Sequence, residues 1–325
     1  MRAMTAGVGR AAVFIGPGQT RVERVALPEP GPHDVRVRLE GCGICGSNLP
    51  VWQGQPWTAY PLEPGAPGHE GWGRIEALGR EVCHLAVGDR VAMLSYHAFA
   101  EGDMAPADAV VRLPAALDSK PFPGEPLGCA VNILRRSEIR PGQRVAIIGI
   151  GFMGALLTGL AVQAGALVMA ISRRPFALEM ARTFGAAETI RMDDHAKVIE
   201  RVKALTENQG CDRVIEAVGQ QPALDLAGEL TRVRGRLIIA GYHQDGARQV
   251  NLQLWNWRGL DVVNAHERAP EILIEGMRAA VDLVTSGKLD PLPLYTHRFD
   301  LDQLPEAFEA MRQRPDGFLK AWIVP

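Results

Sequence analysis

Long apolar runs are missing from the sequence: none approaches the roughly 20 consecutive apolar residues that a membrane-spanning helix needs. The first residues, MRAMTAG, lack the apolar core of a secretory signal, so we expect a cytoplasmic protein. Neither sign of charge dominates, and the formal net charge of −2 at pH 7 argues against nucleic acid or a membrane surface as a partner. The five cysteines are an odd number without compact spacing, which fits reduced thiols or metal ligands rather than a disulfide framework.

The composition is that of a globular chain large enough for two domains. Of its 325 residues, 47% are hydrophobic and 22% are charged. Short strand patterns at residues 35–39, 73–78 and 89–93 predict a small antiparallel β unit. From about Glu125 onward, helices alternate with apolar strands, which predicts an α/β fold with a parallel sheet and right-handed crossovers. In this second part we predict strands at 144–148, 167–171, 214–219, 236–241 and 259–263, and helices at 155–164 and 271–286.

The most informative motif is the stretch GIGFMG at residues 149–154. The β-branched run before it, Arg144–Ile148, is typical of a buried strand, and residues 155–164 are typical of an apolar helix. A glycine turn between a strand and a helix indicates a dinucleotide-binding unit, with a plain tight turn as the structural alternative.

Each glycine of the motif has a physical role in such a unit. Gly149 permits the tight turn, Gly151 lets the backbone approach a pyrophosphate, and Gly154 lets helix and strand pack closely. The N-terminus of the helix then directs unpaired N–H groups at the phosphates. The predicted cofactor contacts are Gly149, Gly151, Phe152, Met153, Gly154, Ser172, Arg173 and Arg174, together with Val218 and Gly241 near the ends of later strands.

The tip of the second strand of this unit indicates which dinucleotide is bound. Dinucleotide folds often place an acidic residue there, roughly 20 residues past the glycines, to bind the ribose hydroxyls. This chain has Ser172, Arg173 and Arg174 instead. A carboxylate would repel a 2′-phosphate, whereas a hydroxyl and two guanidiniums can bind one with charge-assisted hydrogen bonds. The tip therefore predicts NADP(H) in preference to NAD(H), with a solvated basic loop as the alternative.

Two clusters in the first third carry candidate metal ligands, GICGSN at residues 43–48 and PGHEG at residues 67–71. A cysteine thiolate and a histidine imidazole are usual ligands of Zn²⁺, and a catalytic zinc needs three protein ligands and an open position. Taken alone, Cys45 has a more ordinary interpretation as a small buried side chain, and His69 as a hydrogen-bonded loop histidine.

Taken together, these motifs resemble the zinc-dependent medium-chain alcohol and polyol dehydrogenases. That family combines a GroES-like, β-rich catalytic domain with a Rossmann domain built on a doubly wound parallel sheet. The resemblance implies a catalytic domain at residues 1–122, a dinucleotide-binding domain at 123–265 and a return to the catalytic domain at 266–325. The matching segments are GICGS at 43–47, GHE at 68–70, VGDRV at 87–91, EPL at 125–127, the glycine turn and KAWIVP at 320–325.

The resemblance also implies the metal ligands. In that family the cysteine of GICGS and the histidine of GHE bind the catalytic zinc, which corresponds to Cys45 and His69 here. The third ligand comes from the segment that matches EPL, so Glu125 is the implied third ligand, and Glu70 is an exchanging or substitute ligand. Cys129, four residues beyond Glu125, is a weaker alternative.

The proton relay of the family is only partly present. Ser47 matches the serine or threonine that hydrogen-bonds the substrate hydroxyl and passes its proton onward. The next residue is usually an aspartate that orients the zinc-bound histidine, and here it is Asn48, whose neutral amide can orient an imidazole but raises its basicity less. Pro50 stands where many members end the relay with a histidine. Because proline has no side-chain proton to give, the relay has to leave through the cofactor ribose and water, through His97 or by another route.

Many members also hold a structural zinc with four cysteines after the GDRV segment, but this chain has no cysteine between Val91 and Val110. We therefore expect at most one zinc per chain. The resemblance implies hydride transfer between NADP(H) and a small-molecule alcohol or carbonyl, with a polyol- or sugar-like secondary alcohol favoured, in a homodimer or homotetramer. The alternatives are a zinc-free NADPH-dependent quinone or enone reductase of the same superfamily and a catalytically silent nucleotide-binding protein. Trp52, Trp57 and Tyr96 are candidates for lining the substrate pocket, or for core or interface packing.

Overall fold

The computed structural model describes residues 7–325, which divide into two compact units. Unit 1 contains the residues up to Gly128 together with Ala269–Pro325, and unit 2 is Cys129–Arg268. The predicted domain boundaries, after residues 122 and 265, lie near these divisions and stay predictions. No helix in the described part of the chain is long and apolar enough to cross a membrane.

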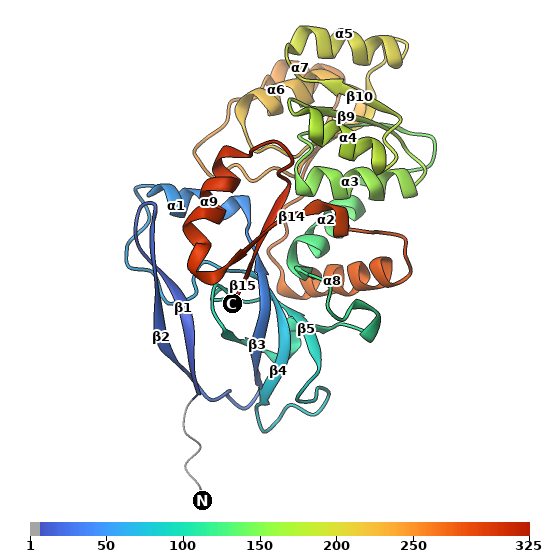
Figure 1. Cartoon of the computed structure of the whole chain (residues 1–325). Helices are drawn as coiled ribbons and strands as arrows, with labels where there is room; N and C mark the ends of the chain where they lie inside the picture. Colours follow the sequence, from blue (N-terminus) through green and yellow to red (C-terminus); the bar gives the residue numbers. More distant parts are fainter. Residues whose placement is uncertain (1–6) are drawn as a thin grey trace, which may run out of the picture. The chain divides into compact units, whose positions relative to one another are not determined.

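Unit 1 is built on a seven-stranded sheet in the order β14-β15-β3-β4-β5-β7, with β6 paired to β3, and a separate β1-β2 hairpin. Its pairs are antiparallel, as predicted, except for β14 and β15, which run parallel. The strands are β1 Gly7–Gly16, β2 Gln19–Leu27, β3 Asp34–Gly43, β4 Glu70–Leu78, β5 Arg90–Met93, β6 Gly102–Pro106, β7 Val110–Arg112, β14 Tyr295–Asp300 and β15 Lys320–Val324. The last strand therefore joins a sheet that the first hundred residues begin, which Figure 1 shows as red β15 beside blue β3.

The helices of unit 1 are short apart from α8. They are α1 Leu49–Gln53, α8 Pro270–Thr285 and α9 Leu304–Gln313, and α2 Gly124–Ser137 begins in this unit and ends in unit 2. Short 3₁₀ helices lie at Gly46–Asn48, Ala107–Ala109, Ala115–Leu117, Leu292–Leu294 and Leu301–Gln303.

An aromatic cluster in the core of unit 1 fixes α1 against α9. The ring of Trp52 stacks on Phe308 at 5.2 Å and meets Phe14 edge-on at 6.2 Å, and its indole N–H donates to Glu309 at 3.0 Å. Trp52 is only 4% exposed. Of the two roles considered for this residue, the structure supports core packing, because the side chain is buried among aromatic rings and its N–H is bonded within unit 1.

Unit 2 contains the predicted parallel sheet. Its order is β10-β9-β8-β11-β12-β13, and every adjacent pair is parallel. The strands are β8 Arg144–Ile148, β9 Leu167–Ser172, β10 Glu188–Arg191, β11 Cys211–Glu216, β12 Thr231–Ile239 and β13 Asp261–Asn264, and the helices are α3 Phe152–Gln163, α4 Pro175–Thr183, α5 His195–Leu205, α6 Gln221–Leu230 and α7 Leu252–Arg258. The chain first adds strands on one side of β8 and then crosses to the other side, so the topological switch point lies between β8 and β11.

Two strands of this sheet end earlier than the hydrophobic pattern predicts. The predicted strand at 214–219 ends at Glu216, whose side chain accepts hydrogen bonds from the backbone N–H groups of Val218 and Gly219. These bonds draw the backbone away from the ladder. The predicted strand at 236–241 ends at Ile239, after which the backbone N–H groups of Ala240 and Gly241 both donate to the carbonyl of Glu216 at 2.8 Å, a pattern that no strand ladder has.

Candidate metal and dinucleotide sites

The ends of two neighbouring strands bring the predicted metal ligands together. Gly43 at the end of β3 pairs with Glu70 at the start of β4, so Cys45 and His69 both lie just beyond the same end of this antiparallel pair. The Cys45 sulfur, a ring nitrogen of His69 and a carboxylate oxygen of Glu70 lie within 4.8 Å of one another. A thiolate, an imidazole and a carboxylate form a donor set that suits Zn²⁺.

The charges around His69 favour its protonated form when no metal is bound. Burial of the ring lowers its pKa, but the hydrogen bond to Cys45, with the charges of Cys45, Glu125 and Glu70, raises the pKa to about 10. A metal ion would therefore displace a proton from this ring in order to bind.

Glu70 is held by a buried lysine from the far end of the sequence. Its carboxylate is fully buried, and Lys320 Nζ in β15 lies 2.7 Å from Oε1 and 2.5 Å from Oε2. The same ammonium group donates to the carbonyl of Ile44 at 3.0 Å. Gly43 leaves room for this carboxylate, since a Cβ at position 43 would lie 1.9 Å from Glu70 Oε2. Glu70 Oε2 receives no hydrogen bond of acceptable geometry, so its contact with the lysine is that of an ion pair.

The imidazole of His69 is oriented by a backbone carbonyl. His69 Nδ1 lies 3.0 Å from the carbonyl oxygen of Pro67, which accepts the N–H of that nitrogen and leaves Nε2 for a metal. Asn48 Nδ2 donates to the same oxygen at 3.2 Å. Asn48 therefore acts on the ring through this shared carbonyl, and its part in orienting the imidazole stays a prediction.

The residues predicted for the proton relay occupy the segment directly after Cys45. Ser47 is half-buried in the 3₁₀ helix Gly46–Asn48. Pro50 lies in the first turn of α1, where its missing N–H would have no helical acceptor. Proline at this position thus suits the start of a helix. His97 is exposed, and its backbone N–H donates to Asp103.

The three glycines of the turn in unit 2 differ in what surrounds them. Gly149 has φ of +96°, a conformation that favours glycine, and a Cβ on Gly154 would lie 2.1 Å from the Gly149 carbonyl oxygen. A Cβ on Gly151 would meet nothing within 4 Å, so packing does not explain that glycine. Gly151 is the N-cap of α3 and provides no capping side chain for the first-turn N–H groups. Uncapped helix N-termini of this kind are typical binding sites for phosphate groups.

The tip of β9 is tied to this turn. Ser172 ends β9, and its Oγ accepts the backbone N–H of Arg174 at 3.3 Å. Arg174 reaches back so that its Nη2 donates to the carbonyl of Ile150 at 3.3 Å. Arg173 is exposed. One arginine thus joins the tip to the turn, and the other projects from it.

Sequence and structure comparisons agree on the family. Residues 31–114 match the alcohol dehydrogenase GroES-like domain, and residues 141–285 match the zinc-binding dehydrogenase family. A sorbitol dehydrogenase of Arabidopsis thaliana is 30% identical, over 92% of this chain and 91% of its own length. The chain belongs to the zinc-type medium-chain dehydrogenase/reductase family. The predicted fold class, with its GroES-like and Rossmann parts, is confirmed.

Two solved structures show how closely the chain follows other dehydrogenases. Alcohol dehydrogenase TADH from Thermus sp. ATN1 superposes with a TM-score of 0.81 at 27% identity, over 97% of this chain and 99% of that one. A zinc-binding dehydrogenase from Sinorhizobium meliloti 1021, solved with NADP, gives a TM-score of 0.83 at 25% identity, over 98% of this chain and all of that one. A medium-chain dehydrogenase of this type is an oxidoreductase with zinc and a nicotinamide cofactor.

The third zinc ligand of this medium-chain dehydrogenase stays a prediction. Within the described residues, the tight donor group holds Glu70 as its carboxylate, and Glu125 is not part of it. Glu125 lies in the first turn of α2, and its charge still acts on His69. Cys129 is likewise not part of that donor group.

Sequence reasoning missed two groups that complete the metal side of this dehydrogenase. One is Lys320, whose signal is a lysine inside the otherwise apolar strand KAWIV, where a buried charge needs a partner. The other is the Pro67 carbonyl, which left no signal because every residue has a backbone oxygen.

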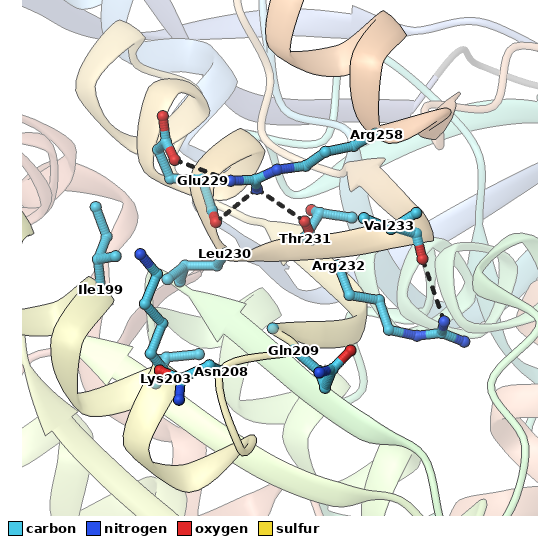
Figure 2. A pocket seen from close by; sticks show the side chains of 12 residues that line it. Ile199, Lys203, Asn208, Gln209, Glu229, Leu230, Thr231, Arg232, Val233 and Arg258 are labelled. Atoms are coloured by element: carbon cyan, nitrogen blue, oxygen red, sulfur yellow. Dashed lines mark hydrogen bonds and ion pairs between the residues drawn. The ribbon is translucent and has the colours of Figure 1, made fainter.

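A surface hollow in unit 2 lies away from the glycine turn. It has a volume of about 130 Å³ and opens at the amino ends of β11 and β12, opposite the edge that carries the turn. Figure 2 shows the Arg258 guanidinium turned toward the end of α6, where Nη1 donates to the carbonyls of Gly228, Glu229 and Thr231 at 3.1, 2.8 and 3.0 Å. Arg258 therefore satisfies the last carbonyls of α6, which gives this lining residue a structural role.

Proposed function

We propose that this chain is a zinc-dependent, NADP(H)-preferring dehydrogenase of a secondary alcohol or its carbonyl. The observation that carries the proposal is the grouping of the Cys45, His69 and Glu70 donor atoms within 4.8 Å in unit 1. Unit 2 provides the dinucleotide half with its glycine turn and basic tip. One zinc per chain is proposed, because the segment between β5 and β6 carries no cysteine.

Cys45 and His69 would hold the zinc, with Glu125 or Glu70 as the carboxylate ligand. Zinc bound there supplies Lewis acidity toward an alcohol or carbonyl oxygen. Ser47, two residues after Cys45, holds the hydroxyl that would exchange a proton with the substrate oxygen. Pro50 has no side-chain proton and cannot continue the relay from Ser47. The proton therefore leaves through the cofactor ribose and water or through His97.

The coenzyme preference rests on the tip of β9. The hydroxyl of Ser172 and the exposed guanidinium of Arg173 offer donors to a 2′-phosphate, and no carboxylate occupies the tip. The relative from Sinorhizobium meliloti, which was solved with NADP, supports this preference.

The coenzyme test is a double substitution, Ser172→Asp with Arg173→Ala. Each lost charge-assisted hydrogen bond contributes about 1.5–3 kcal/mol, so the ratio of kcat/KM for NADP⁺ over NAD⁺ should fall by at least about tenfold to hundredfold. The control is Arg182→Ala in α4, whose side chain bonds Glu179 and Thr189 away from the tip. An unchanged ratio in the double variant would refute the NADP(H) assignment.

The proposed substrate class rests on a likeness to relatives. The sorbitol dehydrogenase of Arabidopsis thaliana supports a polyol- or sugar-like secondary alcohol. A screen of alcohols and carbonyls, followed by the absorbance of reduced nicotinamide, tests it together with metal analysis. We expect about one zinc per chain and loss of activity with a chelator. Turnover of quinones or enones that survives zinc removal would favour a zinc-free reductase, and binding of NADPH without any turnover would favour a silent nucleotide-binding protein.

A further inference from the structure

A chain of hydrogen bonds in unit 2 joins the end of β11 to the loop after β12. Glu216, the last residue of β11, is fully buried, and its Oε1 accepts the backbone N–H groups of Val218 and Gly219 at 2.7 and 2.8 Å. Its Oε2 lies 2.9 Å from His243 Nε2. His243 Nδ1 in turn lies 2.8 Å from Nε of Arg248. We call Glu216, His243 and Arg248 the loop latch.

The geometry determines how the latch is protonated. A guanidinium has donors only, so Nδ1 of His243 accepts from Arg248 and carries no proton. The ring proton therefore resides on Nε2 and is donated to Glu216. The latch runs from a cation through a neutral imidazole to a buried carboxylate, and charge-assisted bonds of this kind are the stronger ones.

Arg248 also bonds back to the turn after β11. Its Nη2 donates to the carbonyl of Gly219 at 3.0 Å and pairs with Asp245. The arginine therefore holds the loop after β12 and the turn after β11 at once. Next to it, Tyr242 stacks on His266 at 5.2 Å, which joins this loop to the segment after β13.

The latch lies where the second half of a dinucleotide has to lie. The adenosine ribose belongs at the tip of β9 and the pyrophosphate at the turn after β8, so the nicotinamide half extends across the switch point toward β11 and β12. The loop after β12, residues 240–251, is twelve residues without a helix or strand, a length that is uncommon unless the loop has a function. The latch fixes six of its residues, 243 to 248, at both ends.

We propose that His243 is a positioning residue for the nicotinamide half of the coenzyme, acting through Glu216 and Arg248 to hold residues 243–248 in their binding conformation before the coenzyme arrives. This inference rests on the proposed dinucleotide function. A loop that is already ordered loses less conformational freedom on binding, so the latch strengthens affinity for the nicotinamide half without touching the adenosine half.

The experiment compares ligands with and without that half. Binding of NADPH, NADH and 2′-phospho-ADP-ribose, which lacks the nicotinamide, is measured by calorimetry for the wild type and for His243→Leu. His243→Leu releases the side chains of Glu216 and Arg248, so the affinity for NADPH and for NADH should fall about tenfold to hundredfold. The affinity for 2′-phospho-ADP-ribose should stay as in the wild type. His243→Gln, whose amide can donate to Glu216 and accept from Arg248, should recover most of the affinity.

Two further variants provide a control and a second way to break the latch. His195→Leu makes the same substitution at the start of α5, away from the latch, and should bind all three ligands as the wild type does. Arg248→Met breaks the latch at the arginine, whose side chain is 16% exposed, so it tests the idea if His243→Leu does not fold, and it should also weaken the binding of NADPH and not that of 2′-phospho-ADP-ribose.

The outcomes separate the two proposals. Equal NADPH affinity in wild type and both latch variants would overturn the inference alone. Equal loss of NADPH and 2′-phospho-ADP-ribose would also overturn it, because the latch would then support the whole nucleotide fold. A wild type that binds neither NADPH nor NADH would overturn the proposed function, and the inference with it.

Discussion

Replacing Lys320 with methionine tests the buried ion pair of the metal side. Both charges are withdrawn from water, with side-chain exposures of 6% for Lys320 and 0% for Glu70. At an effective dielectric constant of about 20, unit charges about 3 Å apart attract by roughly 5–6 kcal/mol. Desolvation of several kcal/mol per ion offsets most of this, so the pair as a whole contributes little.

Removing one partner has a much larger effect than removing both. Lys320→Met leaves the Glu70 carboxylate buried without its cation, and we expect unit 1 to lose about 3–5 kcal/mol of unfolding free energy. The additional substitution Glu70→Gln should recover about 1–3 kcal/mol of this loss, which measures the coupling between the two side chains. The assay is urea unfolding followed by circular dichroism, in chelator and again with zinc.

The matched control is an exposed ion pair in unit 2. Arg201 and Glu188 lie 3.2 Å apart with exposures of 54% and 38%, so Arg201→Met should lose less than about 1 kcal/mol. A loss from Lys320→Met as small as that from Arg201→Met, with no recovery in the double variant, would refute the buried pair as described.

Three other predictions follow from the same contacts. Zinc binding at about pH 8 should release at least about one proton per ion, because the pKa of His69 of about 10 keeps the ring protonated there; calorimetry in buffers of different ionisation enthalpy measures it, and no release would contradict the pKa. Gly43→Ala should destabilise the protein by about 1–3 kcal/mol and weaken zinc binding, since its Cβ would lie 1.9 Å from Glu70 Oε2; Gly16→Ala, with open space around its Cβ, is the control, and equal melting temperatures would refute the crowding. We propose a homodimer or homotetramer, because β13 is an edge strand and Trp257 nearby is 87% exposed; light scattering that gives a monomer would refute it.

The parts of the fold that sequence predicted well depend on local patterns. The strand at Arg144–Ile148 appears with its predicted bounds, because β-branched residues run directly into a glycine turn whose φ only glycine adopts readily. Strand ends near Glu216 were harder, because the side chain competes with the ladder for backbone N–H groups. A hydrophobic pattern gives no information about such hydrogen bonds.

The site was predictable where a residue type carries the chemistry. Cys45 and His69 could be named because their side chains are ligands and their motifs resemble a known family. The Pro67 carbonyl could not be predicted, because every residue has a backbone carbonyl and the residue type does not show which one accepts a hydrogen bond. Trp52 was ambiguous because large aromatic side chains serve cores and pockets alike, and only the stacked Phe308 decides between them.

The return of β15 to the first sheet sets an order of events during synthesis. Lys320 follows Glu70 by 250 residues, and unit 2 is one continuous segment between the two parts of unit 1. The ribosome therefore releases everything needed for the dinucleotide fold before it makes the cation that neutralises Glu70. Until then, Glu70, which directly follows His69, lacks the lysine that pairs with it in the folded protein, so this part of unit 1 cannot be completed before residue 320 is made.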